Sequence, residues 1–232
     1  MPSNDTHGAV RQTDRSREES GTPSAASGRG KSPDEVAEIY GEVADTLHRW
    51  SWADRLFTGR FRGRQFGDAE GRVLDVACGT GTNFPYLPDS VDLVGIDISA
   101  EMLANAREEL DRLGLDGSLH RMDAGALEFP DDSFDTVVSA FSTCTFPDPV
   151  GAIREMRRVC RPDGRILLLE HGRSDAAPVA RFQDWRADTH YEKRGCRWNQ
   201  DPIEHVHEAG LPVVETRRAL LGTVTSIEAL PR

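Results

Sequence analysis

Short apolar runs and amphipathic stretches alternate along most of the chain from about residue 72. Five β-rich runs predict strands: residues 72–77, 91–98, 118–122, 134–140 and 165–170. Apolar residues recur at helical spacing over 99–113, where Ser99 is placed to cap the first turn, and again over 149–160. Strand and helix alternate about five times, which predicts an α/β fold with a mostly parallel sheet and helices on both faces.

The segments on either side of this alternation predict further elements. Ser32 is a candidate N-cap for a first helix with Pro33 at its first position, and a second helix is expected over residues 52–61. Pro162-Asp163-Gly164 predicts a turn before the last strand of the alternation. At the C-terminal end the pattern predicts a short helix and two strands: 202–209, 211–219 and 223–230. A tight connection at 221–222 makes these two strands an antiparallel pair added to the parallel sheet.

Residues 1–33 differ in composition from the rest of the chain. They are mostly Ser, Thr, Gly, Asp and Arg without an aromatic residue, and Val10 is the only large aliphatic residue besides Met1. Such a segment cannot bury enough apolar surface to offset the entropy lost on ordering. We therefore expect a disordered polar tail over 1–33, followed by one domain over 34–232.

Charge and composition exclude several classes of function. The 232-residue chain carries a formal net charge of −11, and an acidic surface argues against a protein that grips nucleic acid through its phosphates. No apolar run is long enough to span a membrane, and the N-terminus lacks the apolar core of a secretory signal. The four cysteines lack metal-finger spacing, so we expect free thiols in a cytoplasmic protein: Cys78, Cys144, Cys160 and Cys196.

The stretch VLDVACGTGTN at residues 73–83 predicts a buried strand that runs into a Gly-x-Gly turn. Gly79 and Gly81 lack a Cβ atom, so a ligand can approach the backbone N–H groups of the turn. Phe84 replaces the third glycine of a nicotinamide-cofactor motif. Asp75 lies inside the apolar strand, where a buried carboxylate needs cationic or N–H partners. It either contributes to a ligand site or holds the backbone of the loop.

Two further acids follow the ends of the next two predicted strands. Asp97 is placed where open α/β sheets bind ligands, and a carboxylate there can accept both hydroxyls of a ribose. Its alternative role is to stabilise the N-terminus of the following helix. Asp123 can accept the exocyclic amine of an adenine, with an ordinary turn Asp as the alternative. Three acids and two glycines at one edge of the sheet are hard to explain as independent structural features.

The chain resembles the class I S-adenosylmethionine-dependent methyltransferases over roughly residues 36–232. Four segments carry the resemblance: VLDVACGTGTN (73–83), LVGIDIS (93–99), RMDAGALEFPDDSFDTVVS (121–139) and EMRRVCRPDGRILLLEHGRS (155–174). The resemblance implies a Rossmann-like fold with S-adenosyl-L-methionine as cofactor. It also implies a set of cofactor-binding residues at the first three strand ends and in the leading helix: Asp75, Ala77, Gly79, Gly81, Asp97, Ile98, Met102, Asp123, Ala124 and Tyr40.

Two groups within this family share segments with the chain. LDVACGTG and LEFPDDSFD are similar to the quinone C-methyltransferases. LLLEHGRS, GCRWNQDP and GTVTSIEALP are more similar to a neighbouring group of thiol methyltransferase-like and phospholipid N-methyltransferase-like proteins. The resemblance therefore implies a small, mostly apolar acceptor such as a quinol, a thiol or a lipid amine. Because that neighbouring group includes membrane-associated proteins, peripheral contact with a membrane fits the resemblance, whereas a membrane span is not expected.

The acceptor is expected beside the fourth and fifth strands, because the cofactor residues follow the first three. Candidate acceptor-side residues are Phe141, Cys144, Glu170, Arg173 and Trp198. His171 directly follows the fifth strand and is a candidate catalytic base, with a hydrogen-bonded hinge residue as the alternative. Methyl transfer needs no nucleophile, so Cys144 is expected to be a buried neutral thiol. No metal site is predicted, because Glu204, His205 and His207 fit a solvated helix face.

Two other functions remain open from the sequence. The first is an RNA or DNA methyltransferase, but residues 139–142 read Ser-Ala-Phe-Ser where amino-methylating enzymes often carry an Asn/Asp-Pro-Pro-aromatic box. The second is a sensor or assembly protein that binds S-adenosylmethionine without turnover. Product formation with a panel of acceptors would separate that protein from an enzyme.

Overall fold

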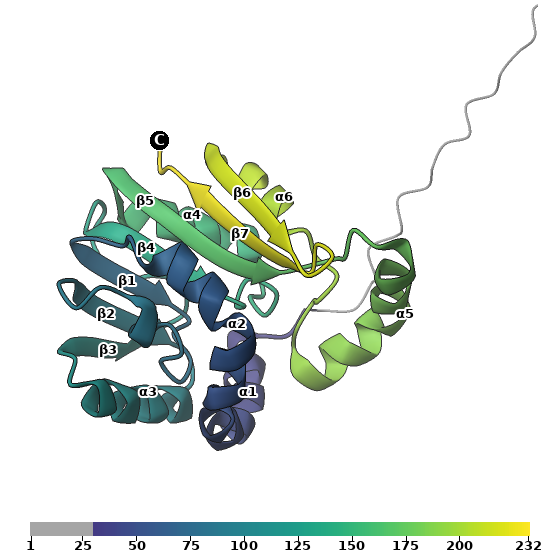
Figure 1. Cartoon of the computed structure of the whole chain (residues 1–232), viewed down its shortest axis with the longest axis horizontal. Coiled ribbons are helices and arrows are strands. Elements are labelled where there is room, and N and C mark those ends of the chain that lie inside the picture. Colours follow the sequence, from purple (N-terminus) through teal and green to yellow (C-terminus); the bar gives the residue numbers. More distant parts are fainter. Residues whose placement is uncertain (1–29) are drawn as a thin grey trace, which may run out of the picture.

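The computed structural model describes residues 30–232, which form a seven-stranded sheet with helices on both faces (Figure 1). The strand order is β3-β2-β1-β4-β5-β7-β6. The strands are β1 (Arg72–Val76), β2 (Asp92–Asp97), β3 (Gly117–Arg121), β4 (Phe134–Ala140), β5 (Cys160–His171), β6 (Val213–Ala219) and β7 (Val224–Ala229). The first five strands are parallel, and β7 pairs antiparallel with both β5 and β6. The predicted fold class is confirmed, whereas most of the predicted tail lies outside the described residues.

The helices are α1 (Pro33–Arg49), α2 (Ser51–Phe66), α3 (Ala100–Leu113), α4 (Pro149–Val159), α5 (Ala177–Arg194) and α6 (Pro202–Glu208), with a short 3₁₀ turn at Phe84–Tyr86. Four of them, α2, α3, α4 and α6, pack on the sheet through two apolar clusters. Ile153 of α4 joins Leu74 of β1 in one cluster, and Leu110 of α3 joins Val73 of β1 in the other. Neighbouring strand residues thus serve opposite faces, which explains why β1 is apolar along most of its length. None of the helices within residues 30–232 is long and apolar enough to cross a membrane.

Side-chain caps begin the helices that the sequence predicted at Ser32 and Ser99. Ser32 Oγ accepts a hydrogen bond from the Glu35 N–H at 3.3 Å, and the Glu35 carboxylate accepts one from the Ser32 N–H at 2.6 Å. This reciprocal pair is a capping box. Ser99 Oγ accepts from the Met102 N–H at 3.2 Å at the start of α3. Both predicted N-caps are therefore confirmed.

Local structure differs from the sequence prediction in two places. Pro162-Asp163-Gly164 lies within β5 and not in a turn before it, so that prediction was wrong. The pairing of β4 with β5 passes from Phe134–Cys160 to Thr136–Arg165, and the extra residues of β5 are accommodated as a bulge. The helix α5 was not predicted, because its buried residues are only Ala180 and Gln183 and no apolar stripe marks it. It lies at the side of the molecule, beyond the end of the sheet (Figure 1).

Candidate functional site

A cavity of about 450 Å³ lies at the carboxyl ends of β1, β2 and β4. It contains the residues that the sequence analysis placed at one edge of the sheet. Four segments that follow strands line it, within residues 77–83, 97–102, 122–124 and 140–147. The helices α1 and α2 cover the cavity and contribute, among others, Tyr40, Leu47 and Arg62.

The Gly-x-Gly turn after β1 leaves space for a ligand at one of its two glycines. Gly79 lines the cavity at φ +56°, and a Cβ built on it would meet no atom within 4 Å. Gly81, at φ +79°, is packed instead, since a Cβ there would come within 2.6 Å of the Phe84 ring. Gly81 therefore shapes the turn, while Gly79 leaves its backbone open to a ligand. Ala77 also lines the cavity and has φ +54°, which is uncommon for a residue with a side chain.

Asp97 ends β2 and lines the cavity with a nearly buried side chain. Its Oδ2 accepts a hydrogen bond from the Gly79 N–H at 2.9 Å, and its Oδ1 accepts one from the Ser99 N–H at 2.9 Å. Burial raises the pKa of Asp97, and these backbone hydrogen bonds oppose the shift. An ionised carboxylate has about four acceptor positions, so Asp97 can support the start of α3 and still accept hydrogen bonds from a ligand.

Asp75 reaches the cavity only through Asn83. The Asp75 carboxylate is fully buried and accepts from Asn83 Nδ2 at 2.9 and 3.1 Å. Asn83 lines the cavity, and its Oδ1 accepts a hydrogen bond from the Arg62 guanidinium. Burial raises the pKa of Asp75 to about 7, although the Asn83 hydrogen bond and the charge of Arg62 both lower it. The direct contacts of Asp75 are thus those of an acid that holds the loop, which was the alternative left open by the sequence.

One polar face of α2 also lines the cavity, and the sequence analysis missed it. Asp54, Thr58 and Arg62 follow one another at four-residue spacing and all line the cavity. Thr58 Oγ1 accepts from Arg62 Nε at 3.1 Å, and Arg62 Nη2 lies 3.3 Å from Asp54 Oδ2. Arg62 is only 4% exposed. The i, i+4 spacing of an acid, a hydroxyl and an arginine was the available signal, because such residues share one helix face.

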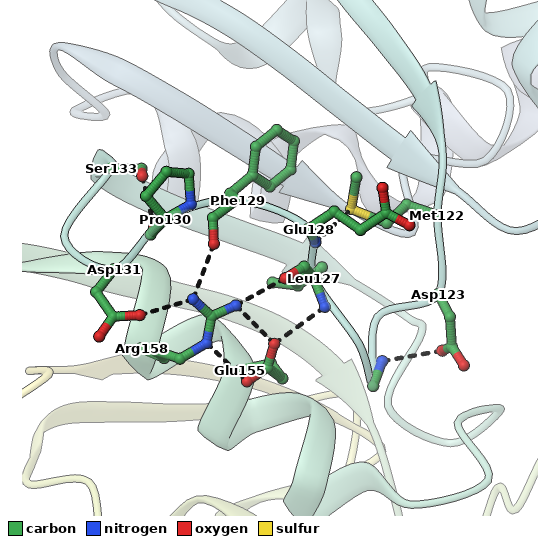
Figure 2. A network of polar contacts seen from close by, with 11 residues as sticks. Met122, Asp123, Leu127, Glu128, Phe129, Pro130, Asp131, Ser133, Glu155 and Arg158 are labelled. Atoms are coloured by element: carbon green, nitrogen blue, oxygen red, sulfur yellow. Dashed lines mark hydrogen bonds and ion pairs between the residues drawn. The ribbon is translucent and has the colours of Figure 1, made fainter.

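The loop between β3 and β4 carries Asp123, which lines the cavity and accepts a hydrogen bond from the Gly125 N–H at 2.9 Å. Figure 2 shows that Arg158 of α4 holds the continuation of this loop. Its guanidinium donates to the carbonyl oxygens of Leu127 and Phe129 at 2.7 and 2.8 Å. Glu155 pairs with Arg158 at 2.8 Å and accepts the Leu127 N–H at 3.0 Å. The network fixes the chain that leads away from Asp123.

The loop after β4 forms the opposite wall of the cavity. Phe141 begins it at φ +54° and lines the cavity, and Phe146 lines it further along. Glu170 of β5 is fully buried beneath this loop and accepts the N–H groups of Ser142 and Thr143 at 3.1 and 3.3 Å. Burial raises the pKa of Glu170 to about 7, against the opposing charge of His171. Glu170 therefore shapes the wall from behind.

The segment that contains α5 attaches to the back of the same loop. The Arg197 N–H donates to the Cys144 carbonyl at 2.8 Å, and Gln200 Nε2 donates to Thr143 Oγ1 at 2.9 Å. Trp198 donates its ring N–H to the Gln183 carbonyl at 3.1 Å and stacks on His190 with ring centres 4.2 Å apart. Arg173 pairs with Asp184 of α5 at 2.8 Å. Arg173 and Trp198 thus hold this segment together at a distance from the lining of the cavity.

His171 lies behind the Phe141 wall and faces two cysteines. Its ring stacks on Phe141 with centres 5.9 Å apart, and its Nε2 lies 3.3 Å from Cys144 Sγ and 3.5 Å from Cys196 Sγ. Burial lowers the pKa of His171, but the contact with Cys196 and the charge of Glu170 outweigh it and the pKa is raised. The contacts with Cys144 and His171 hold the pKa of Cys196 well below its usual range despite burial.

Most of the predicted cofactor residues come together around the cavity, whereas most of the predicted acceptor residues do not. Eight of them line it: Tyr40, Ala77, Gly79, Asp97, Ile98, Met102, Asp123 and Ala124. Asp75 and Gly81 lie behind this lining. On the acceptor side Phe141 lines the cavity, while the other candidates are not part of the lining: Cys144, Glu170, His171, Arg173 and Trp198.

Comparison with known proteins agrees with this geometry. Residues 74–168 match the family described as "Methyltransferase domain". Phosphatidylethanolamine N-methyltransferase of Cereibacter sphaeroides is 41% identical over 135 residues, which cover 53% of this chain and 66% of that relative. Demethylmenaquinone methyltransferase of Renibacterium salmoninarum is 36% identical over 159 residues, which cover 64% of this chain and 63% of that relative. The chain thus spans just under two thirds of the length of these curated relatives.

The fold is shared with solved methyltransferase structures. A putative methyltransferase, solved in complex with the Haloferax volcanii methyltransferase activator Trm112, superposes with a TM-score of 0.67. The match covers 83% of this chain and 97% of that one at 20% sequence identity. Residues 74–168 are thus similar to the methyltransferase domains of these curated relatives, and the solved structures show that the fold is shared with methyltransferases.

Proposed function

We propose that this protein transfers the methyl group of S-adenosylmethionine to a small, mostly apolar acceptor. The observation that carries the proposal is one continuous cavity with two kinds of lining. One part contains the glycine turn and the acids Asp97 and Asp123, and the other contains the aromatic side chains of Phe141 and Phe146. The formal net charge of −11 argues against a nucleic acid as acceptor.

The residues present fit the cofactor. We propose that Asp97 accepts the ribose hydroxyls, that Asp123 with Ala124 contacts the adenine edge, and that the open backbone at Gly79 receives the methionine part. The space beside Gly79 and the unused acceptor positions of Asp97 support this assignment. When bound, the cofactor supplies a methyl group that is already activated on a sulfonium sulfur.

The protein's main tasks are then to align the acceptor and to exclude water. The helices α1 and α2 cover the cavity, with Tyr40 and Leu47 on α1 among the lining residues. Burial raises the pKa of the Tyr40 hydroxyl, so this group remains a hydrogen-bond donor at neutral pH. Phe141 and Phe146 give the acceptor an apolar surface on the side of the cavity away from Asp97.

Three acceptor classes suit such a wall: a quinol, a thiol and a lipid amine. The relative from Cereibacter sphaeroides is named for a lipid amine and the one from Renibacterium salmoninarum for a quinone precursor, so both classes belong in the first screen. A thiol is included because of the resemblance of the GCRWNQDP segment noted above.

The test is the release of S-adenosylhomocysteine with a short-chain quinol, an alkyl thiol and a phosphatidylethanolamine analogue. We expect release with one of these classes. Phe146→Ala should then raise KM for that acceptor several-fold without weakening cofactor binding, while Phe182→Ala serves as a matched control because Phe182 is 52% exposed on α5. Cofactor binding without release from any acceptor would favour the sensor alternative, and release only with RNA would favour the nucleic-acid alternative.

A further inference from the structure

Three potential metal ligands from distant parts of the chain converge behind the Phe141 wall. Cys144 lies in the loop after β4, His171 ends β5, and Cys196 follows the glycine that ends α5. The two Sγ atoms lie 3.3 Å apart, and His171 Nε2 lies 3.3 and 3.5 Å from them. The three ligand atoms all lie within 4.8 Å of one another. Cys144 and Cys196 are 1% and 6% exposed, and His171 is half-buried, so the two sulfurs are enclosed while the imidazole retains some access to solvent.

These separations are close to those around a tetrahedral metal ion. With Zn–S bonds of ~2.3 Å and a Zn–N bond of ~2.1 Å, tetrahedral angles place two sulfurs about 3.8 Å apart and a sulfur and a nitrogen about 3.6 Å apart. The distances between the three ligand atoms in this structure are shorter than these values by at most about 0.5 Å. Side-chain rotations are therefore sufficient to admit the ion. A disulfide would bring the sulfurs to about 2.0 Å and would give no role to an imidazole nitrogen that contacts both.

We propose that Cys144, His171 and Cys196 form a binding site for Zn²⁺ that ties the acceptor-side wall of the cavity to the segment after α5. Two thiolates balance the double charge of the ion and the imidazole is neutral, so the occupied site has no net charge. This neutrality suits a buried position, where an unbalanced charge is costly. Two protons leave the cysteines when the ion binds. The fourth position is left for a water molecule, as in zinc sites with three protein ligands.

The surroundings hold the ligands in place from outside the cluster. The Phe141 ring stacks on His171. The Arg197 N–H donates to the Cys144 carbonyl. Because Arg197 directly follows Cys196, this hydrogen bond joins the chain at Cys196 to the loop that carries Cys144. Such supporting contacts orient metal ligands and are part of most metal sites. The bound ion would join three segments that are otherwise connected by hydrogen bonds and packing.

The test uses the full chain, purified with reductant, stripped with a chelator and titrated with Co²⁺ without oxygen. Wild type is expected to bind one equivalent, with a sulfur-to-cobalt charge-transfer band and the strong visible bands of a four-coordinate site, and Zn²⁺ should displace the cobalt. Cys144→Ser and Cys196→Ser should each abolish the charge-transfer intensity or reduce it to that of one sulfur. Cys160→Ser is the matched control and should keep the full spectrum, because Cys160 is equally buried but lies at the start of β5.

Two results would overturn the proposal. One is a reduced wild-type protein without these bands, and the other is a Cys144→Ser/Cys196→Ser double variant that keeps them. If the variants fail to fold, thiol alkylation of wild type replaces them, and Zn²⁺ should then protect Cys144 and Cys196 while leaving Cys160 unaffected by the ion. Equal alkylation with and without Zn²⁺, or a Cys144–Cys196 disulfide in the metal-treated protein, would also count against the site. None of these readouts depends on methyl transfer.

Discussion

The guanidinium of Arg62 lies over the ring of Phe141, 5.1 Å from the ring centre, and so joins α2 to the acceptor-side wall. The same group donates to Asn83 and pairs with Asp54. We expect Arg62→Met to weaken cofactor binding and to lower the free energy of unfolding by ~1–3 kcal/mol, because several buried polar partners lose their donor. Calorimetry and urea unfolding measure the two effects. Arg60→Met, an exposed position on the same helix, should change neither, and equal effects of the two variants would contradict the assignment.

Asp97→Ala is expected to weaken binding of S-adenosylmethionine or S-adenosylhomocysteine by ~1–3 kcal/mol, the scale of a lost charged acceptor. The variant also removes the acceptor for the Gly79 and Ser99 N–H groups, so its melting temperature should fall as well. Asp92→Ala is the control, because Asp92 begins the same strand with an exposed side chain. Tight binding of NADH by wild type without a response to S-adenosylmethionine would contradict the cofactor site.

The buried carboxyl of Asp75 predicts a pH-dependent stability. Its pKa is raised from 3.8 to about 7 in the folded protein, so the folded state holds the proton more tightly than the unfolded state does. This stabilising contribution is present below about pH 4 and is lost as the pH rises to about 7. Relative to Asp75→Asn, the free energy of unfolding of wild type should therefore fall across this range in urea titrations without ligand. A difference between wild type and Asp75→Asn that stays flat with pH would contradict the burial argument.

The N-terminal boundary can be tested by truncation. A chain that begins at Gly30 is expected to keep the melting temperature of the full chain within error, because it retains the Lys31 N–H donor to the Tyr191 hydroxyl at 2.7 Å and the Ser32 cap. A chain that begins at Asp34 loses both and should be less stable by ~1 kcal/mol or more. A large loss of stability in the chain that begins at Gly30, relative to the full chain, would show that residues 1–29 contribute to the fold.

His171→Ala is expected to leave cofactor affinity nearly unchanged and to lower turnover on the true acceptor. His171 does not line the cavity, but its ring supports Phe141, which does. Because its Nε2 faces two cysteines, we expect a loss smaller than the ~10²-fold or more that accompanies removal of a general base. Steady-state kinetics with the acceptor identified in the screen provide the measurement. Parallel losses of cofactor affinity and turnover would place His171 on the cofactor side instead.

The strands, the glycine turn and the acids at one edge of the sheet could be predicted because each is marked by residues that are close together in the sequence. An apolar run that ends in Gly79-x-Gly81 can be recognised without information about distant residues. The N-caps Ser32 and Ser99 can be recognised from the residues within four positions of them. The residues that the sequence did not indicate depend on contacts between segments. Arg62 faces the cavity only because α2 covers it, and Cys144 approaches Cys196 across 52 positions.

Burial places several predicted site residues away from the lining of the cavity. Asp75 has the spacing of a ligand-binding acid, yet it is fully enclosed and acts on the cavity through Asn83. Glu170 and Trp198 have the right place in the chain order for the acceptor side, but Glu170 accepts hydrogen bonds from the wall loop from behind and Trp198 donates to the Gln183 carbonyl of α5. The order of residues along the chain predicts which of them lie at the end of a strand. The direction in which their side chains point depends on the residues that pack around them.

The segment between β5 and α6 has a further consequence for how this protein could change over generations. The predicted cofactor residues all precede residue 125, whereas residues 172–201 meet the acceptor-side wall from outside through a few hydrogen bonds, such as the one from Arg197 to Cys144. An exchange of sequence confined to this stretch would leave every predicted cofactor residue in place. The predicted cofactor half and the segment behind the acceptor-side wall could thus vary independently of each other from one generation to the next.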